Sequence, residues 1–244
     1  MKICAVIPSF NHYEKLEPIT SHLKNIGLAV ILVDDASTAP YADKLAELAK
    51  KDDNISLVVH KKNKGKGGAV MTGLLQAGKA GYSHALQIDA DGQHNMDDIA
   101  TALSLAKDNP GALISGRPVY DESIPKSRLI GREITHFWVK IETLSWQTKD
   151  TMCGFRVYPL AETCQLLEQV KLGERMDYDI EVMVRLDWRN VPILFFPTHV
   201  KYPEDGKSHF RALEDNVLIS WLHTRLVFGM LIRLPFLLWN KLKR

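Results

Sequence analysis

The stretch LQIDADGQHNM, residues 86–96, places oxygen-bearing side chains at alternate positions directly after an apolar run. Asp89 and Asp91 are two residues apart, so they point the same way if the segment is extended. Together with Gln93 they offer the oxygen ligands that Mg²⁺ or Mn²⁺ prefers, and such cations often complete their coordination with substrate phosphates. The spacing differs from that of a calcium-binding EF-hand, because the twelfth loop position holds Ala100 instead of Glu. We therefore predict a divalent-metal site at these three residues.

Polar residues also follow two other apolar runs in the first half of the chain. The first run ends in PSFN at 8–11, and the second ends in Asp34 and Asp35. In an open α/β sheet, ligands bind beyond the carboxyl ends of the strands. Each turn alone is equally well explained by ordinary turn and capping residues. Carboxylates gathered at one edge repel each other unless a cation joins them, so the turns together favour a binding site.

A glycine-rich stretch, NKGKGGAVMTG at 63–73, leads into a segment with helical spacing. It is not a Walker A loop, because Gly67 rather than Ser or Thr follows Lys66. A glycine-rich turn at the start of a helix can still present backbone N–H groups to an anion. A tight turn with a solvated lysine is an equally open interpretation. We predict that Lys66 contributes to nucleotide binding.

The composition narrows the class of protein. The chain has 244 residues, of which 45% are apolar and 25% charged, as in a globular domain. The net charge of only +2 gives no indication of a nucleic-acid partner, and we expect none. Three scattered cysteines do not make a disulfide framework. The first apolar run is too short for the core of a signal peptide, which predicts a cytoplasmic protein.

Apolar runs alternate with segments of helical spacing in the first half, and these elements must position the polar turns. Strands are expected at 2–8, 28–35, 55–60, 84–89 and 111–116. Helices are expected at 14–25 and 41–51. Strand–helix–strand alternation at this spacing implies right-handed crossovers and a parallel sheet with helices on both faces. The predicted fold class is therefore α/β.

Six motifs, taken together and in this order, resemble family 2 glycosyltransferases near the branch of polyprenyl-phosphate and dolichol-phosphate sugar synthases. They are VIPSFN, VDDAS, NKGKGGA, DADGQH, D-TMCGFRVYP and RMDYDIEVMVR. The resemblance implies the GT-A fold, with a Rossmann-like, mostly parallel sheet. It also implies an inverting, metal-dependent transfer of a sugar from a UDP- or GDP-linked donor to a lipid acceptor. Phe10 and His12 depart from the Tyr and Glu that are usual in the family's first motif, which leaves the nucleotide base open.

The resemblance also assigns roles to residues of the nucleotide-binding half. Pro8 and Asp35 would hold the base and the ribose, and Asp34 would support the loop. The D-x-D-x-Q residues would hold the metal and the diphosphate. The nucleotide would be bound by Pro8, Ser9, Phe10, Asn11, Asp35, Lys66, Asp89, Ala90 and Asp91.

The second half supplies candidates for the chemistry. Asp150 matches the acid of the family's acceptor loop, and Asp179 has the spacing of the family's catalytic Asp before Arg185. Asp177 and Glu181 are rivals for the base, although Glu181 could instead form an i,i+4 ion pair with Arg185. A hydroxyl acceptor needs a general base, whereas a lipid phosphate is already an anion and needs cations. We predict Asp179 as the base, and Asp150 as a second catalytic residue.

Basic residues from Arg117 onward, together with Ser208, are candidates for binding the acceptor or the diphosphate. The candidate set is Arg117, Arg128, Arg132, Lys207, Ser208, His209 and Arg211. Each group alone is more typical of a solvated surface. The last group resembles the loop that closes over the diphosphate in relatives, with Gly206 as its hinge.

The C-terminal segment 216–244 is strongly apolar but carries spaced charges. On a helix, one side would hold Val217, Trp221, Phe228, Leu231 and Leu238, and the other Arg225, Arg233, Lys241 and Arg244. The uncharged run 226–232 has 7 residues, whereas a helix that crosses a bilayer needs roughly 20. The pattern predicts an interfacial helix, kinked at Pro235, whose basic residues face anionic headgroups. Packing on its own domain or on a dimer partner is the alternative.

We predict a glycosyltransferase domain at 1–211, with a nucleotide-binding half (1–120) and an acceptor half (121–211), followed by the helix 212–244. It would act at the inner face of the cytoplasmic membrane on polyprenyl phosphate or a lipid hydroxyl. Two rivals remain. A nucleotidyltransferase would need a basic, glycine-rich loop where this chain has PSFNHYE. A non-catalytic scaffold that binds nucleotide-sugars would have no reason to keep clustered carboxylates.

Overall fold

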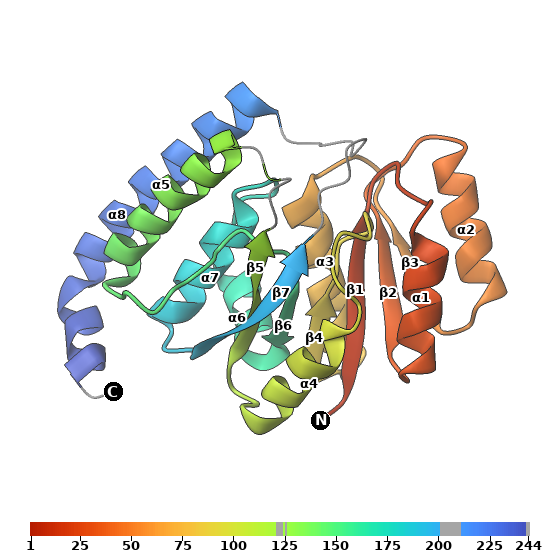
Figure 1. Cartoon of the computed structure of the whole chain (residues 1–244), viewed down its shortest axis with the longest axis horizontal. Coiled ribbons are helices and arrows are strands. Elements are labelled where there is room, and N and C mark those ends of the chain that lie inside the picture. The colour runs from red at the N-terminus through yellow and green to blue at the C-terminus, as the bar shows by residue number, and fades with distance from the viewer. Residues whose placement is uncertain (121–123, 125, 201–210, 243–244) are drawn as a thin grey trace.

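The computed structural model describes residues 1–120, 124, 126–200 and 211–242. Its strands form one seven-stranded sheet in the order β3-β2-β1-β4-β6-β5-β7 (Figure 1). Neighbouring strands are parallel except around β6, which runs antiparallel to both β4 and β5. The predicted α/β class with a mostly parallel sheet is therefore confirmed.

The strands are β1 (Ile3–Ser9), β2 (Ala29–Asp34), β3 (Ile55–Val59), β4 (His84–Gln87), β5 (Leu113–Tyr120), β6 (Arg156–Pro159) and β7 (Ile193–Val200). The helices are α1 (Leu16–Asn25), α2 (Tyr41–Lys51), α3 (Lys66–Lys79), α4 (Asp98–Asp108), α5 (Lys126–Thr143), α6 (Leu160–Gln169), α7 (Tyr178–Trp188) and α8 (Ala212–Leu242). The five expected strands correspond to β1 to β5, and the two expected helices to α1 and α2.

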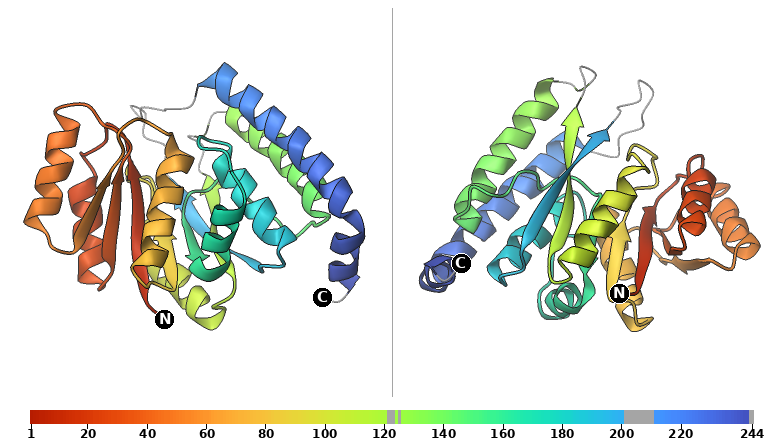
Figure 2. Two further views of the ribbon diagram at one scale, coloured as in Figure 1. Left: turned by 180° about the vertical axis from the view of Figure 1, so that it is seen from behind. Right: turned by 60° about the horizontal axis from the view of Figure 1, so that its bottom comes forward.

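Alternation of side chains across the sheet creates two hydrophobic cores. On β1, Ala5 and Ile7 face the core formed with α1, α2 and α4. Cys4 and Val6 face the opposite core, formed with α3, α6 and α7. All four side chains are fully buried, which explains why a parallel strand covered on both faces reads as a continuous apolar run. Figure 2 shows helices on both sides of the sheet.

A third core joins the C-terminal helix to the rest of the chain. Leu222 and Leu226 of α8 pack with Val139 of α5 and with Val184 of α7. α5 and α8 lie side by side along one flank of the molecule (Figures 1 and 2). The expected alternative, in which the C-terminal helix packs on its own domain, is thus correct for one face of α8.

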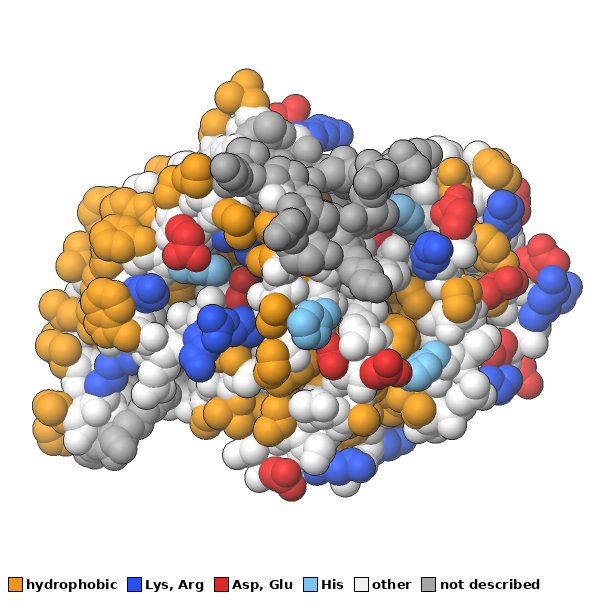
Figure 3. All heavy atoms as spheres, in the orientation of Figure 1, with side chains coloured by type: hydrophobic (Ala, Val, Ile, Leu, Met, Phe, Trp, Pro, Cys, Tyr) orange, Lys and Arg blue, Asp and Glu red, His pale blue; other side chains and the backbone are white. Residues whose placement is uncertain are grey.

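The other face of α8 is exposed and apolar. It includes all five residues expected to share one side, namely Val217, Trp221, Phe228, Leu231 and Leu238. Hydrophobic side chains gather on this flank of the surface in Figure 3. The segment Leu213–Leu242 is long and apolar enough to cross a membrane by length and composition, and 28% of its most apolar window is buried in the molecule. The sequence argument against crossing therefore does not hold, because two arginines in so long an apolar helix do not exclude it.

The sheet brings the polar turns to one edge. Ser9 at the end of β1 pairs in register with Asp34 at the end of β2, and Asp89 follows β4 on the other side of β1. α3 lies tightly on β1, because a side chain at Gly73 would overlap Val6. This close packing places the glycine-rich turn before α3 at the same edge.

Candidate active site

Asp35 joins the end of β2 to the glycine-rich turn. Its buried carboxylate accepts hydrogen bonds from the backbone N–H of Lys64 at 2.9 Å and of Gly65 at 2.8 Å. The ring of His60 lies 2.6 Å from the same carboxylate through Nδ1. Gly65 has a φ of 91°, which favours glycine, and it caps the start of α3. Asp35 thus anchors this turn, and its contact with a ribose stays a prediction.

The loop after β1 is fastened to the loop after β2. Asn11 donates its backbone N–H to the Ser37 hydroxyl at 2.9 Å, and its side-chain oxygen accepts the backbone N–H of Thr38 at 2.9 Å. Asp34 accepts the backbone N–H of Ser37 at 2.8 Å, and so it supports this loop. The residues expected around the base, from Pro8 to Asn11, therefore lie at the edge where β1 and β2 end.

Lys66 connects two carboxylates that the sequence analysis assigned to different tasks. Its Nζ lies 2.8 Å from Oδ2 of Asp89, a predicted metal ligand, and 3.2 Å from Oδ2 of Asp179, the predicted base. Gly154 makes room for this contact, because a Cβ there would lie 2.7 Å from both Lys66 Nζ and Asp89 Oδ2. Asp89, Asp179, Lys66 and Gly154 therefore form one cluster, which we call the Lys66 cluster.

The charges in the Lys66 cluster stabilise one another. Burial alone would raise the pKa of Asp89, but the positive charge of Lys66 and the contact with His94 outweigh it and leave the pKa lowered. Burial alone would lower the pKa of Lys66, but the carboxylates of Asp179 and Asp89 outweigh it and leave the pKa raised. At neutral pH the ammonium and the Asp89 carboxylate are therefore both charged.

The D-x-D-x-Q segment has the donor set for a hard divalent cation. Oδ1 of Asp89 is buried and has no hydrogen-bond partner within the described part of the chain. Asp91 accepts the backbone N–H of Gln93 at 3.0 Å, which folds the segment into a turn at Gly92. The described residues contain no group of three His, Cys, Asp or Glu side chains that could hold a metal by themselves. Two carboxylates and an amide fit Mg²⁺ or Mn²⁺ with donor phosphates as further ligands.

A second cluster surrounds Asp150 on the acceptor side. One oxygen of Asp150 accepts the backbone N–H groups of Met152 at 2.9 Å and Cys153 at 2.8 Å. The other accepts Nη2 of Arg132 and lies 3.5 Å from Nε2 of His136. Burial alone would raise the pKa of Asp150, but His136 and Arg132 lower it to about 2. Asp150 thus holds two nitrogen-bearing side chains of α5 at the site, and its catalytic role stays a prediction.

Arg156 is fully buried beneath Asp179. It donates to the backbone carbonyl of Asp179 at 2.8 Å and to that of Thr151 at 2.7 Å, and its Nη1 lies 3.8 Å from Oδ1 of Asp179. The D-x-x-x-G-F-R motif therefore has three structural roles. Asp150 pairs with Arg132 of α5, Gly154 leaves room for Lys66, and Arg156 fixes the start of α7. The sequence analysis missed Arg156, because an arginine at the start of a short strand gives no signal of full burial.

The three acidic candidates around the start of α7 have different environments. Glu181 is fully buried; it lies 2.7 Å from Nη2 of Arg185 and accepts the backbone N–H of Gly173 at 2.8 Å. The i,i+4 ion pair considered as an alternative is therefore present. Asp177 accepts the backbone N–H of Arg175 at 3.2 Å. Of the three, Asp179 is the one that contacts Lys66 in the part of the chain that the structure describes.

The predicted basic residues are only partly brought together. Arg132 belongs to the Asp150 cluster and lies over the ring of Tyr120, 5.2 Å from its centroid. Arg117 is exposed on β5. Arg211 lies directly before α8 and pairs with Glu214 at 2.7 Å. The side chain of Arg128, and Lys207, Ser208 and His209 with their loop, lie outside the described residues.

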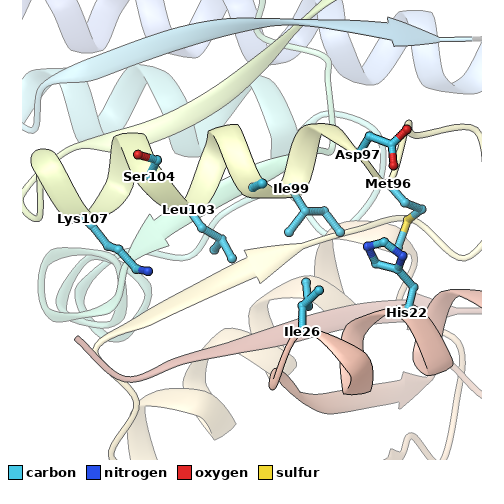
Figure 4. A pocket seen from close by; sticks show the side chains of 9 residues that line it. His22, Ile26, Met96, Asp97, Ile99, Leu103, Ser104 and Lys107 are labelled. Atoms are coloured by element: carbon cyan, nitrogen blue, oxygen red, sulfur yellow. The ribbon is translucent and has the colours of Figure 1, made fainter.

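A cavity of about 440 Å³ lies between α1 and α4, away from both clusters. Figure 4 shows His22 and Ile26 on one wall and Met96, Ile99 and Leu103 on the other. Its lining includes none of the predicted catalytic or metal-binding residues. The candidate active site is therefore the strand-end edge with its two clusters, and this cavity is separate from it.

The arrangement of strands and helices is that of the GT-A fold. The structure of glucosyl-3-phosphoglycerate synthase from Mycobacterium tuberculosis, in complex with Mn²⁺ and UDP-glucose, matches with a TM-score of 0.66. It is 13% identical, and the match covers 94% of this chain and 78% of that chain. At this identity the likeness shows the fold alone.

Sequence comparison defines the family. Residues 4–161 match the model of glycosyl transferase family 2, and the chain belongs to this family. It is 27% identical to the UDP-N-acetylglucosamine–dolichyl-phosphate N-acetylglucosaminyltransferase of Methanococcus voltae, over 90% of this chain and 92% of that protein. It is 30% identical to the dolichyl-phosphate β-glucosyltransferase of Dictyostelium discoideum, over 67% of this chain and 52% of that protein. The chain thus spans about half of the latter relative.

Proposed function

We propose that this family 2 glycosyltransferase moves a sugar from a UDP- or GDP-linked donor to a polyprenyl phosphate, with inversion and with Mg²⁺ or Mn²⁺. The observation that carries the proposal is the Lys66 cluster at the strand-end edge. There, one oxygen of Asp89 pairs with Lys66 and the other, which is buried, has no hydrogen-bond partner within the described part of the chain. The relatives named as dolichyl-phosphate glycosyltransferases support the acceptor class. Membership of a glycosyltransferase family disfavours the nucleotidyltransferase alternative.

The surroundings of Asp179 favour a phosphate over a hydroxyl acceptor. Lys66 lies 3.2 Å from one oxygen of Asp179, and Arg156 lies 3.8 Å from the other. Each oxygen of Asp179 therefore already faces a cation of the protein itself, so the carboxylate serves as an ion-pair partner at the site. A lipid phosphate needs no base, because it is already an anion. We therefore propose that Asp179 orients Lys66 rather than taking a proton.

In the proposed reaction, an acceptor phosphate oxygen forms a bond to the anomeric carbon while the bond from that carbon to the nucleotide diphosphate breaks. A bound divalent cation would neutralise charge on the departing diphosphate. Asp89, Asp91 and Gln93 would hold that cation, and Lys66 would add a positive charge beside it. Arg132 and His136, held by Asp150, would attract the acceptor phosphate.

The donor half of the proposal is tested by thermal stability. UDP or GDP with Mn²⁺ is expected to raise the Tm of the wild-type protein by several degrees, because a ligand that binds only the folded state stabilises it. Asp91→Asn should remove this shift while leaving the Tm of the free protein unchanged, because Asp91 is a partly exposed turn residue. A full shift in the variant would contradict the metal site, and a shift without metal in the wild type would contradict metal dependence.

We further propose that the catalytic domain, 1–211, is held at the cytoplasmic face of the membrane by the C-terminal segment 212–244, which contains α8. The exposed apolar face of α8 carries Trp221 and Phe228, which are 60% and 63% exposed. From Asn216 onward the chain has no acidic residue but keeps basic ones, including Arg225 and Arg233. Arg225 lies 3.5 Å from the carboxylate of Glu181, and Arg233 lies over the ring of Trp188, so both face α7 and the expected basic face toward the headgroups is not formed by them. The proposed attachment therefore rests on the apolar face.

A vesicle flotation experiment tests this attachment. The double variant Trp221→Glu, Phe228→Glu is expected to float with phosphatidylglycerol vesicles at least tenfold less than wild type, because each side chain would lose about 1.5–3 kcal/mol of burial. Ile26→Glu, directly after α1, is the matched control, since Ile26 is also an exposed apolar residue, 44% exposed, and should leave flotation unchanged. Equal flotation of the double variant and the control would refute attachment through α8.

A further inference from the structure

His94, the residue after the D-x-D-x-Q segment, is buried with ring nitrogens that lack hydrogen bonds within the described residues. Its side chain is 8% exposed, and neither ring nitrogen has a hydrogen-bond partner within the described part of the chain. Leaving a buried polar group without a hydrogen bond is unfavourable. A histidine in so unfavourable an environment points to a functional role at the site. Nothing in the predicted function uses it.

The His94 ring is fixed from two sides. It packs on Phe155 with a centroid distance of 5.1 Å and a tilt of 39°. Its backbone forms an antiparallel bridge with Val200 at the end of β7. The ring is therefore held where it is and directs Nε2 at the carboxylate of Asp89, 3.5 Å from Oδ2.

The two oxygens of Asp89 are in different environments. Oδ2 lies between Lys66 Nζ at 2.8 Å and His94 Nε2 at 3.5 Å, whereas Oδ1 is buried and has no hydrogen-bond partner among the described residues. A carboxylate held by one oxygen presents the other in a fixed direction. Groups that hold a metal ligand in this way tune the affinity of the site, and their loss typically weakens metal binding by 10- to 100-fold.

We propose that His94 is a positioning residue that, with Lys66, holds Oδ2 of Asp89 so that Oδ1 faces the divalent cation. The inference rests on the proposed metal site and adds a residue to it. The separation of 3.5 Å is at the outer limit of a hydrogen bond, as is common in active sites before substrate binds. His94 thereby links the metal segment to Phe155 of the acceptor loop and to β7.

Titration of Mn²⁺ into the protein, with free Mn²⁺ followed by electron paramagnetic resonance, tests the proposal. His94→Phe keeps a ring against Phe155 but loses the nitrogen, and we expect it to bind Mn²⁺ at least tenfold more weakly than wild type. His94→Gln places an amide near the position of Nε2 and is expected to restore most of the affinity. His94→Met, which has the shape of glutamine without the amide, serves as a second loss variant if His94→Phe does not fold.

The outcomes separate this inference from the proposed function. Wild-type Mn²⁺ binding that is unchanged in the Phe and Met variants would overturn the role of His94 and leave the metal site intact. A wild-type protein that binds no Mn²⁺, even with UDP or GDP, would overturn both. Strong ¹⁴N coupling to bound Mn²⁺ in the wild type would make His94 a direct ligand and would also overturn the positioning role. Weak binding in a folded variant, restored by Gln, supports it.

Discussion

Lys66→Met is expected to lower the free energy of unfolding by about 3 kcal/mol, because removing one partner of a buried ion pair leaves an uncompensated charge. In the wild type, the ammonium lies within 2.8 Å of Asp89 and 3.2 Å of Asp179. Without it, the partly buried carboxylate of Asp89 and the buried carboxylate of Asp179 repel each other. We also expect sugar transfer to fall by about 10²–10³-fold, the usual loss when a group that stabilises developing charge is removed.

The response of Lys66→Met to Mn²⁺ distinguishes loss of the ion pair from ordinary destabilisation. A divalent cation bound at Asp89 can replace part of the missing positive charge, so Mn²⁺ should raise the Tm of Lys66→Met more than that of the wild type. Lys64→Met is the matched control, since Lys64 is an exposed lysine of the same glycine-rich turn. If Lys66→Met is as stable as Lys64→Met and responds equally to Mn²⁺, the Lys66 cluster does not have the energetic role assigned to it.

Arg132→Met is expected to reduce transfer to a polyprenyl phosphate by about 10²–10³-fold while leaving nucleotide binding intact, because it removes a cation from the acceptor side alone. Arg132 donates a hydrogen bond to Asp150, and its guanidinium lies over the ring of Tyr120. The KM for the acceptor and the Tm shift by the donor nucleotide separate the two effects. Lys140→Met, on the same helix, is the control, since Lys140 lies over the exposed Trp146 and not in the cluster.

The acid stability of Arg132→Met gives a second readout. With His136 and Arg132, the folded-state pKa of Asp150 is lowered to about 2 from an ordinary value of 3.8. A lowered folded pKa stabilises the protein above the ordinary pKa, and this contribution, about 2 kcal/mol, is lost as the pH falls from about 4 to 2. Without Arg132 the pKa of Asp150 rises, so the variant should lose stability at a higher pH than the wild type. Identical acid transitions in the two proteins would show that the pair is not formed.

Much of the fold follows from local pattern. Apolar runs such as ICAVIPS form strands because both faces of β1 are buried, and the parallel order then brings the strand ends to one edge. The position of Asp89 at that edge was predictable for this reason. The antiparallel β6 was not, because RVYP is short and contains an arginine, which ordinarily indicates exposure.

The parts of the site that the sequence did not predict depend on tertiary packing. Nothing local shows that Lys66 reaches Asp179, since the two residues are separated by more than a hundred positions and meet only through the packing of α7 against α3. The role of Arg156 depends on the same packing. Helical spacing did predict the apolar face of α8 but not which apolar residues would be buried, because Leu222 and Leu226 are as hydrophobic as the exposed Leu231.

The central claim is metal-dependent transfer of a sugar to a lipid phosphate. The most direct measurement incubates the protein with radiolabelled UDP- or GDP-sugars and Mn²⁺, with either polyprenyl phosphate or the matching polyprenol, and follows label into the lipid phase. The account predicts transfer to the phosphate alone, its loss when Mn²⁺ is chelated, and a product of inverted anomeric configuration. Transfer to the polyprenol instead, or equal transfer without a divalent cation, would contradict it.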